Sequence, residues 1–372
     1  MLQLPFFETY PQSLAWFKTI GPTWANRWHA TEETRLLVDP QENLAIEALW
    51  LHPARREKLV VLSVGEHGIE GYVGSTMARL FCEQFLGQLN PENTGVVFVH
   101  AINPWGMSHY RRVNKNGVDL NRNFILNDSF NNNYNQGFSS LSSLLVPCKP
   151  IGNFELQYAS LFFKIANSIL KHGMATLTRV TLLGQYQQPR SIFFGGQSLQ
   201  PESEFVVASI KKAMAEYQHI LILDQHTGYG PRYQMGVVVP PTEPLSSAQL
   251  EEKFGYPYVV KGNQEEFYQI NGDMVQAISD LGQGHPGAKI DFACSFEFGT
   301  YGDGLLARAK SLAAMILESQ NYSYPAISQR SDQKVRQIFK ELYFPSEPAW
   351  RQKALQDGYA AFKGILSAYQ YI

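Results

Sequence analysis

Two histidines and a glutamate lie directly after apolar runs of this sequence. KLVVLSV is followed by G-E-H-G-I-E, which contains His67 and Glu70, and HILILD is followed by Q-H-T-G, which contains His226. A catalytic zinc ion takes three protein ligands, often two histidines and a glutamate, and keeps one position for water. These three residues are therefore candidate ligands of one zinc ion. The spacing H-x-x-E also fits a surface histidine beside a helix-capping glutamate. Glu66 is a competing carboxylate, although neighbours on an extended chain point to opposite faces.

A further carboxylate, Glu297, lies inside the apolar run S-F-E-F-G. A buried carboxylate without a partner is costly, so this position needs a metal, a cation or a shifted pKa. Glu297 is therefore a candidate for proton transfer or for binding positive charge.

The elements that position these residues are predicted from the hydrophobic pattern. Apolar runs that suit strands alternate with segments of helical spacing, which favours an α/β sheet between helical layers. In such sheets, ligand sites form beyond the carboxyl ends of the strands. We predict strands within 35–52 and at 58–64, 95–101, 178–183, 219–224, 235–240 and 289–299, and helices at 10–28, 71–88, 153–171, 203–217, 305–320, 332–341 and 349–368.

Two polar segments interrupt this pattern. Residues 125–150 show little periodicity and are predicted to be a long loop, which we expect to shape a pocket mouth. The segment G-Q-Y-Q-Q-P-R-S-I-F-F-G-G lacks the phosphate-binding glycine motifs, so a nucleotide site is not indicated. It fits either a plain turn or a pocket wall with Arg190, Phe193 or Phe194 near a substrate.

No shift in composition marks a domain linker. We therefore predict one domain over residues 1–372, with an N-terminal segment 1–52 and C-terminal helices 305–372 packed on it.

Charge and composition exclude several classes of partner. The chain has 31 basic and 33 acidic residues, a net charge of −2, so a nucleic-acid partner is not indicated. No run is long enough to span a membrane, and the N-terminus has no basic region typical of a secretory signal. Three dispersed cysteines indicate neither a disulfide framework nor a cysteine metal site. We expect a cytoplasmic protein.

A longer pattern carries a family resemblance. H-G-I-E is followed by R-V-N-K-N-G-V-D-L-N-R-N-F, D-Q-H-T-G and F-E-F-G, in this order over about residues 55–305. This sequence resembles the zinc carboxypeptidase superfamily, with carboxypeptidase A as its type member, and more closely a bacterial branch without an assigned substrate. The resemblance implies a three-layer α/β/α fold with a mixed central sheet and a zinc metallohydrolase activity.

The resemblance also implies a role for each matching residue. His67, Glu70 and His226 match the zinc ligands, and Asp119 matches the carboxylate that orients a liganding histidine. Arg112 matches the arginine that polarises the scissile carbonyl. Asn121 and Arg122 match the pair that binds the terminal carboxylate of the substrate, and Glu297 matches the general base that activates water. Without the resemblance, the two arginines fit surface ion pairs and Asp119 fits a turn cap at Gly117.

Two departures bear on the substrate. Ile69 stands where carboxypeptidases have an arginine between the first two ligands. Residues 269–290 contain no tyrosine, so Tyr268 is the remaining candidate for the tyrosine of the mobile loop. The H-G-x-E form also resembles the aspartoacylase and succinylglutamate desuccinylase relatives.

Three functions follow in order of preference. The first is a carboxypeptidase-like hydrolase of small peptides. The second is a deacylase of N-acyl amino acids. The third is an inactive relative that binds a carboxylate ligand, which is disfavoured because all the catalytic residue types are present.

Overall fold

The structure is a computed structural model that describes residues 4–126, 130–131, 134–262 and 270–372. The strands are β1 (Ala30–Asp39), β2 (Leu44–His52), β3 (Lys58–Val64), β4 (Thr94–His100), β5 (His219–Thr227), β6 (Met235–Val239), β7 (Val259–Lys261) and β8 (Lys289–Phe298). The α-helices are α1 (Tyr10–Trp24), α2 (Gly71–Gln84), α3 (Pro104–Ser108), α4 (Ser142–Leu145), α5 (Phe154–His172), α6 (Met174–Leu182), α7 (Pro201–Glu216), α8 (Ser247–Phe254), α9 (Met274–Gly282), α10 (Leu305–Ser323), α11 (Gln329–Tyr343) and α12 (Pro348–Ala368). No described helix combines the length and apolar composition that a membrane span needs.

The eight strands form one mixed sheet in the order β1-β2-β4-β3-β5-β8-β6-β7. Its centre is parallel, because β3 pairs in parallel with β4 and β5, and β5 with β8. Antiparallel pairing begins at β2 on one side and at β6 on the other. The carboxyl ends of β3, β5 and β8 therefore lie side by side at one edge of the sheet.

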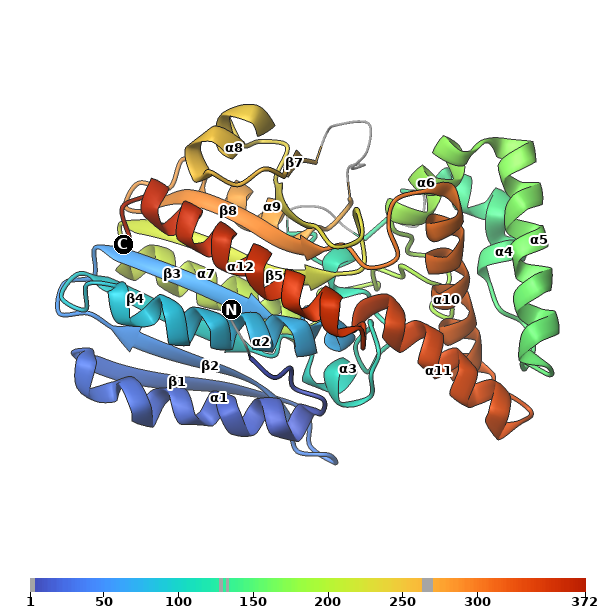
Figure 1. The fold of residues 1–372 in the computed structure, drawn as a ribbon, viewed down its shortest axis with the longest axis horizontal. Coiled ribbons are helices and arrows are strands. Elements are labelled where there is room, and N and C mark those ends of the chain that lie inside the picture. The colour runs from blue at the N-terminus through green and yellow to red at the C-terminus, as the bar shows by residue number, and fades with distance from the viewer. Residues whose placement is uncertain (1–3, 127–129, 132–133, 263–269) are drawn as a thin grey trace.

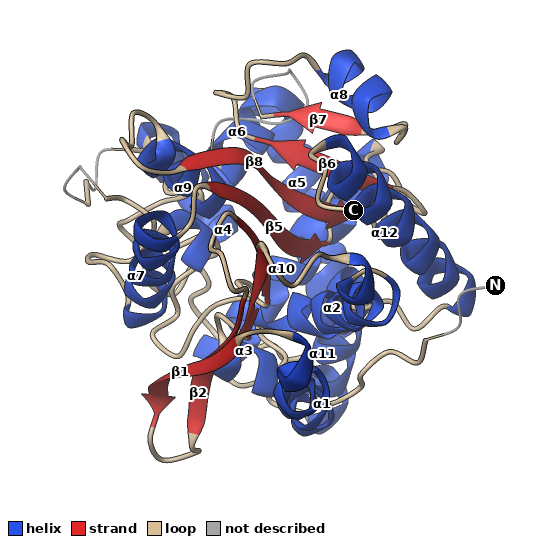
Figure 2. Ribbon diagram, turned by 90° about the vertical axis from the view of Figure 1, so that its left-hand side faces the viewer, coloured by secondary structure: helices blue, strands red, loops and turns tan. Residues whose placement is uncertain are grey.

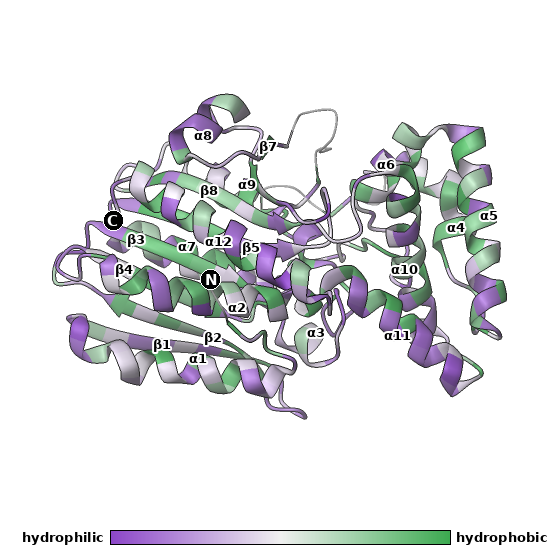
Figure 3. Cartoon of the chain, viewed as in Figure 1, coloured by the Kyte–Doolittle hydropathy of each residue, from purple (hydrophilic) through white to green (hydrophobic). Residues whose placement is uncertain are grey.

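Helices cover both faces of the sheet (Figure 2). One apolar core joins the sheet to α1, α2, α8 and α12, and a second joins the opposite face to α7 and α9. The central strands are apolar on both faces, as buried parallel strands are (Figure 3). The predicted three-layer α/β/α class with a mixed sheet is confirmed.

A third core lies at the carboxyl ends of the strands, within a group of five helices (Figure 1). We call α4, α5, α6, α10 and α11 the end helices. Their core also contains Ile69 and Phe193, which follow β3 and precede α7. The end helices therefore stand where open α/β sheets place their ligands.

Two predictions in this region are wrong. The predicted strand at 178–183 is the last part of α6, because the apolar face of that segment packs into the core of the end helices. Its threonines and valine favour strands locally, but tertiary packing overrides that preference. The predicted loop 125–150 contains a 3-10 helix at Gln136–Leu141 and the short helix α4. Phe138, Leu141 and Leu145 anchor both to the same core.

Candidate functional site

Two 3-10 helices and two strands bring most of the predicted residues together. Glu70 ends a 3-10 helix, Gly68–Glu70, which follows β3 directly, with His67 just before it. A second 3-10 helix, Leu120–Arg122, is preceded by Asp119. His226 and Glu297 are paired neighbours in the register of β5 and β8.

The donor atoms of the three predicted zinc ligands lie close together. The Nδ1 atoms of His67 and His226 lie 3.2 Å apart. One Glu70 carboxylate oxygen lies 2.9 Å from His67 Nδ1, and the other lies 3.1 Å from His226 Nδ1. All three side chains are buried. Two histidine nitrogens and a carboxylate are donors that zinc accepts.

The outer nitrogens of both histidines face carboxylates. His67 Nε2 lies 3.1 Å from Asp119 Oδ1, and His226 Nε2 lies 2.5 Å from Asp224 Oδ2. With each Nε2 turned to its carboxylate, both Nδ1 atoms face each other beside the Glu70 carboxylate. Three electron-rich atoms at such distances need a cation or protons between them. The residues thus fit a metal ion, and the two carboxylates fix the imidazole orientation as outer partners of metal ligands do.

The pKa values of Glu70 and His226 are shifted by the charges of their neighbours. Burial acts to raise the pKa of Glu70, but His67 and His226 hold it well below its usual range. Burial also opposes a charge on His226, yet Asp224 leads a set of carboxylates that raise its pKa. The cluster therefore stabilises positive charge at its centre.

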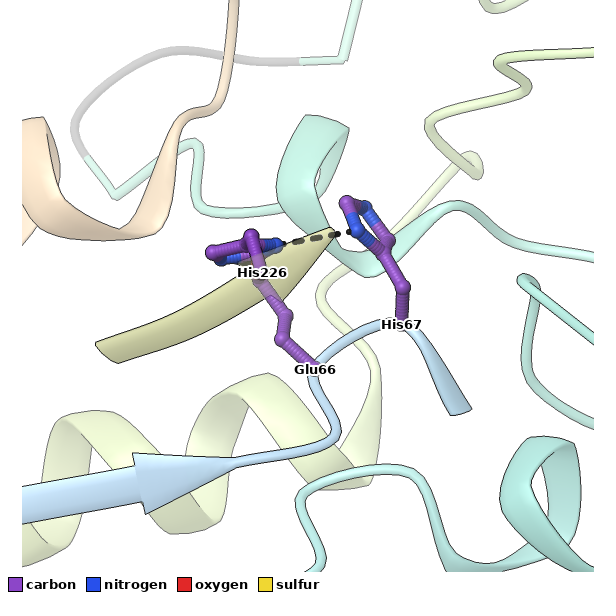
Figure 4. A group of neighbouring side chains, drawn as sticks. All are labelled: Glu66, His67 and His226. Atoms are coloured by element: carbon purple, nitrogen blue, oxygen red, sulfur yellow. Dashed lines mark hydrogen bonds and ion pairs between the residues drawn. The ribbon is translucent and has the colours of Figure 1, made fainter. Parts of the chain in front are cut away.

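Glu66 is the competing carboxylate, and it lies on the other side of His226. Its Oε2 is 3.2 Å from His226 Nε2, within ion-pair distance, and Figure 4 shows Glu66 beside His67 and His226. Glu66, His67 and His226 also offer donors within 4.8 Å of one another. We favour Glu70 as the third ligand, because its oxygens face the same Nδ1 atoms that face each other. Burial raises the pKa of Glu66 to about 7.

Arg112 is held between two carboxylates of the cluster. Its Nε donates to Asp119 Oδ2 and its Nη1 to Glu70 Oε1, both at 2.9 Å. Asp119 therefore bridges Arg112 and His67, and it does not serve as a cap at Gly117. The ring of Phe193 lies 5.6 Å from the Arg112 guanidinium carbon.

Arg122 and Asn121 are fixed by backbone groups. Arg122 Nε donates to the carbonyl of Leu182 and its Nη1 to that of Asn121, at 3.0 and 2.8 Å. The Asn121 side-chain oxygen accepts from Met274 N at 2.8 Å. Burial lowers the pKa of Arg122, although Asp119 opposes this. The contact with Leu182 connects Arg122 to the end of α6.

One cavity of about 200 Å³ contains most of these groups. His67, Arg112, Asn121, Arg122, His226 and Glu297 all line it, together with apolar side chains of the end helices. Glu70 and Asp119 lie behind this lining. Glu297 accepts a hydrogen bond of 2.9 Å from Tyr229 N. Burial, followed by the nearby Glu70 carboxylate, raises the pKa of Glu297 to about 7.

The polar segment before α7 supplies one predicted wall residue. Phe193 lines the cavity. Phe194 instead packs in the core beneath the sheet, and exposed Arg190 donates to the Tyr324 hydroxyl.

Other residues at the site have no predicted counterpart. Tyr343 and Arg308, from α11 and α10, line the cavity but belong to no motif that sequence analysis singled out. Their helices are far from the motifs in sequence, so only the fold brings them there. Tyr268, the weak candidate for a loop tyrosine, lies outside the described residues.

This chain is similar to several solved structures, and the three described next have low sequence identity to it. Bovine thrombin-activatable fibrinolysis inhibitor, solved with tick carboxypeptidase inhibitor, is 14% identical over 89% of this chain and 98% of that chain, with a TM-score of 0.49. Carboxypeptidase A from Helicoverpa armigera is 15% identical over 90% of this chain and 73% of that chain, with a TM-score of 0.48. An aspartoacylase family protein from Mesorhizobium loti is 12% identical over 77% of this chain and 67% of that chain, with a TM-score of 0.36.

Comparison at the sequence level gives a single family. No curated protein matches the chain. One family model matches residues 6–357, nearly the whole length. The chain therefore belongs to the family described as "Protein of unknown function (DUF2817)".

Proposed function

We propose that this protein is a zinc-dependent hydrolase that cleaves an amide bond next to a free carboxylate, as a metallocarboxypeptidase does. The observation that carries the proposal is that the Nδ1 atoms of His67 and His226 lie 3.2 Å apart and that each lies within 3.1 Å of a Glu70 carboxylate oxygen. Two of these ligands line the same cavity as Glu297 and Arg122. Ligands, a base and a carboxylate-binding cation would thus surround one substrate.

The proposed chemistry divides between the ion and the chain. A zinc ion at such a site supplies a Lewis acid and lowers the pKa of water. Glu297 takes a proton from the attacking water and returns it to the leaving amine. A carboxyl group with a pKa of about 7 suits both steps near neutral pH, since it is neither fully ionised nor fully protonated.

Two arginines divide the remaining roles. Arg112 stabilises the oxyanion of the scissile carbonyl, and Glu70 and Asp119 hold its guanidinium in place for that purpose. Arg122, with Asn121, binds the free carboxylate of the substrate. Its Nε and Nη1 are used by carbonyls, and no described residue accepts from Nη2, so Nη2 is left for the substrate. Guanidinium groups suit carboxylates because their donors lie in one plane.

Because residue 69 is isoleucine, the site lacks one arginine that related carboxypeptidases have. The Ile69 side chain is fully buried in the core of the end helices. The arginine that related carboxypeptidases carry there would have to enter that core. Substrate carboxylate binding in this chain would therefore depend more heavily on Arg122.

The proposal is tested by amidating the substrate and mutating the enzyme together. The zinc-loaded protein is assayed on a dipeptide and on an N-acyl amino acid, each with a free and an amidated carboxylate. Loss of a buried, charge-assisted contact costs on the order of 2–5 kcal/mol. We therefore expect amidation to lower wild-type kcat/KM by at least tenfold, and to add little in Arg122→Ala.

The matched control is Arg190→Ala, which removes an exposed arginine. Equal cleavage of free and amidated substrates by the wild type would contradict the proposed carboxylate recognition. Comparing rates on the dipeptide and the N-acyl amino acid also separates a peptidase from a deacylase.

A further inference from the structure

Arg308 is a third arginine of the cavity, and it comes from the second turn of α10. The wall that the end helices contribute is otherwise built from apolar side chains, a few hydroxyl groups and the phenol of Tyr343. Among the described lining residues from these helices, Arg308 alone carries a formal charge. A cation in such a wall marks one position where an anionic group of a ligand is favoured over water.

The guanidinium groups of Arg112, Arg122 and Arg308 donate hydrogen bonds to different kinds of acceptor. Arg112 is bound by two buried carboxylates, and Arg122 is bound by two carbonyls. Arg308 is half-buried, and its Nε donates to the carbonyl of Asp303 at 2.7 Å in an exposed contact. Within the described parts of the chain, Arg308 forms no salt bridge with a carboxylate. Its two terminal amino groups are therefore available to an external anion.

We propose that Arg308 binds a second carboxylate of the substrate, while Arg122 binds the first. This inference rests on the proposed function, because it takes the first carboxylate to lie at Arg122. The substrates it assigns are small amides with two carboxylates. The second carboxylate comes either from a diacid acyl group or from an acidic residue next to the scissile amide. A cavity of about 200 Å³ suits compounds of this size better than a folded polypeptide.

The carboxylate of Asp303 argues against this assignment, because its negative charge would repel a second substrate carboxylate. It lines the same part of the cavity, next to Arg308. It is exposed, however, so water and salt screen its charge more than that of a buried carboxylate. Its carbonyl, rather than its carboxylate, contacts Arg308.

The experiment compares isosteric substrates with and without the second charge. One arm uses N-succinyl-leucine against N-butyryl-leucine, and the other uses N-acetyl-glutamyl-leucine against N-acetyl-glutaminyl-leucine. Each pair is assayed on the zinc-loaded wild type, Arg308→Gln and Lys310→Gln. Lys310 is an exposed lysine two residues further along α10 and serves as the matched control.

We expect the wild type and Lys310→Gln to prefer the charged member of at least one pair by about tenfold in kcat/KM. Arg308→Gln should reduce that preference to less than about threefold. The arm that shows the preference identifies the source of the second carboxylate. An equal preference in wild type and Arg308→Gln, or none in the wild type, would overturn the inference.

Binding measurements test the role of Arg308 independently of the proposed hydrolase activity. Calorimetric titration with succinate and butyrate needs no turnover. If no amide is cleaved, the proposed function fails, and the inference is then decided by binding alone. It stands if Arg308→Gln removes the stronger binding of succinate, and it fails if the variant binds both acids as the wild type does.

Discussion

Glu297 and Glu66 are two carboxylates beside the same histidine, yet only Glu297 lines the cavity. Burial raises the pKa of each to about 7. Their difference is therefore one of access: Glu297 can reach a substrate and a water molecule, whereas Glu66 is fully enclosed. We therefore assign the base of the proposed reaction to Glu297.

Replacing Glu297 by glutamine tests this assignment. Glutamine keeps the shape of the side chain but cannot accept a proton. We expect Glu297→Gln to retain zinc and fold while kcat falls by about two to four powers of ten. Steady-state kinetics with elemental analysis measures both, and exposed Glu204→Gln is the control. Turnover at the wild-type rate would rule out Glu297 and make Glu66 the next residue to test.

Site residues that belong to sequence motifs were predictable from the sequence. Residues that only the fold brings to the site were not. H-G-I-E and D-Q-H-T-G marked His67 and His226, whose donors do converge. No local signal marked Arg308 or Tyr343, because a helical arginine or tyrosine has many structural uses. Asp224 was also missed as the partner of His226, although it lies two residues away on the same face of β5.

At the scale of elements, the turn after β3 depends on close backbone packing. A Cβ on Gly68 would lie 2.1 Å from the carbonyl carbon of Gly106 and 2.2 Å from the nitrogen of Met107. The 3-10 helix that contains Glu70 thus rests directly on α3. This contact explains why glycine follows His67.

Gly68→Ala should therefore disturb the metal site without changing a ligand. The added methyl group clashes with backbone, which cannot move as a flexible side chain can. We expect zinc affinity to fall by at least tenfold, together with a lower melting temperature. Chelator competition and calorimetry measure the two effects. The control is Gly304→Ala, because a Cβ there meets no atom within 4 Å. Unchanged zinc affinity in Gly68→Ala would contradict this role of the turn.

The contact between β4 and α1 should make the free energy of unfolding depend on pH. His100 is buried at the end of β4, and its Nε2 lies 2.6 Å from the Ser13 hydroxyl of α1. Burial lowers the pKa of His100 to about 3. Unfolding releases this histidine to its usual pKa of about 6.5. The neutral form thus stabilises the fold fully above pH 6.5, and this stability is lost as the pH falls toward 3.

Urea denaturation of wild type and His100→Gln between pH 4 and 7 measures the effect. We expect the free energy of unfolding of the wild type to fall by about 1.4 kcal/mol more per pH unit than that of the variant, below pH 6. Groups that titrate in both proteins cancel in the difference. Exposed His29→Gln should follow the wild type. Parallel curves for wild type and His100→Gln would contradict the assignment.

Elements with a clear period were predictable, and short or conflicting ones were not. The apolar run 58–64 is β3 residue for residue, since a buried parallel strand leaves a continuous apolar run. The 178–183 segment failed because its β-branched residues favour a strand while the core of the end helices selects a helix. The three-residue strand β7 is too short to give a period.

At the scale of the whole molecule, the sheet and the end helices have separate tasks. The carboxyl ends of β3, β5 and β8 position the candidate metal ligands and Glu297. The end helices close the cavity and supply its apolar wall and Arg308. The α/β class could be predicted because alternation of strands and helices is a property of the whole sequence. The cavity could not, because its walls come from segments more than a hundred residues apart.

The most direct test of the central claim is the zinc content of the purified protein, measured together with amide hydrolysis. The proposal predicts one zinc ion per chain in the wild type. Glu70→Gln and His226→Ala should lose both zinc and turnover, whereas His219→Ala, a change of a half-exposed histidine at the start of β5, should keep both. A wild type that binds no zinc, or a Glu70→Gln variant that keeps zinc and activity unchanged, would contradict the account.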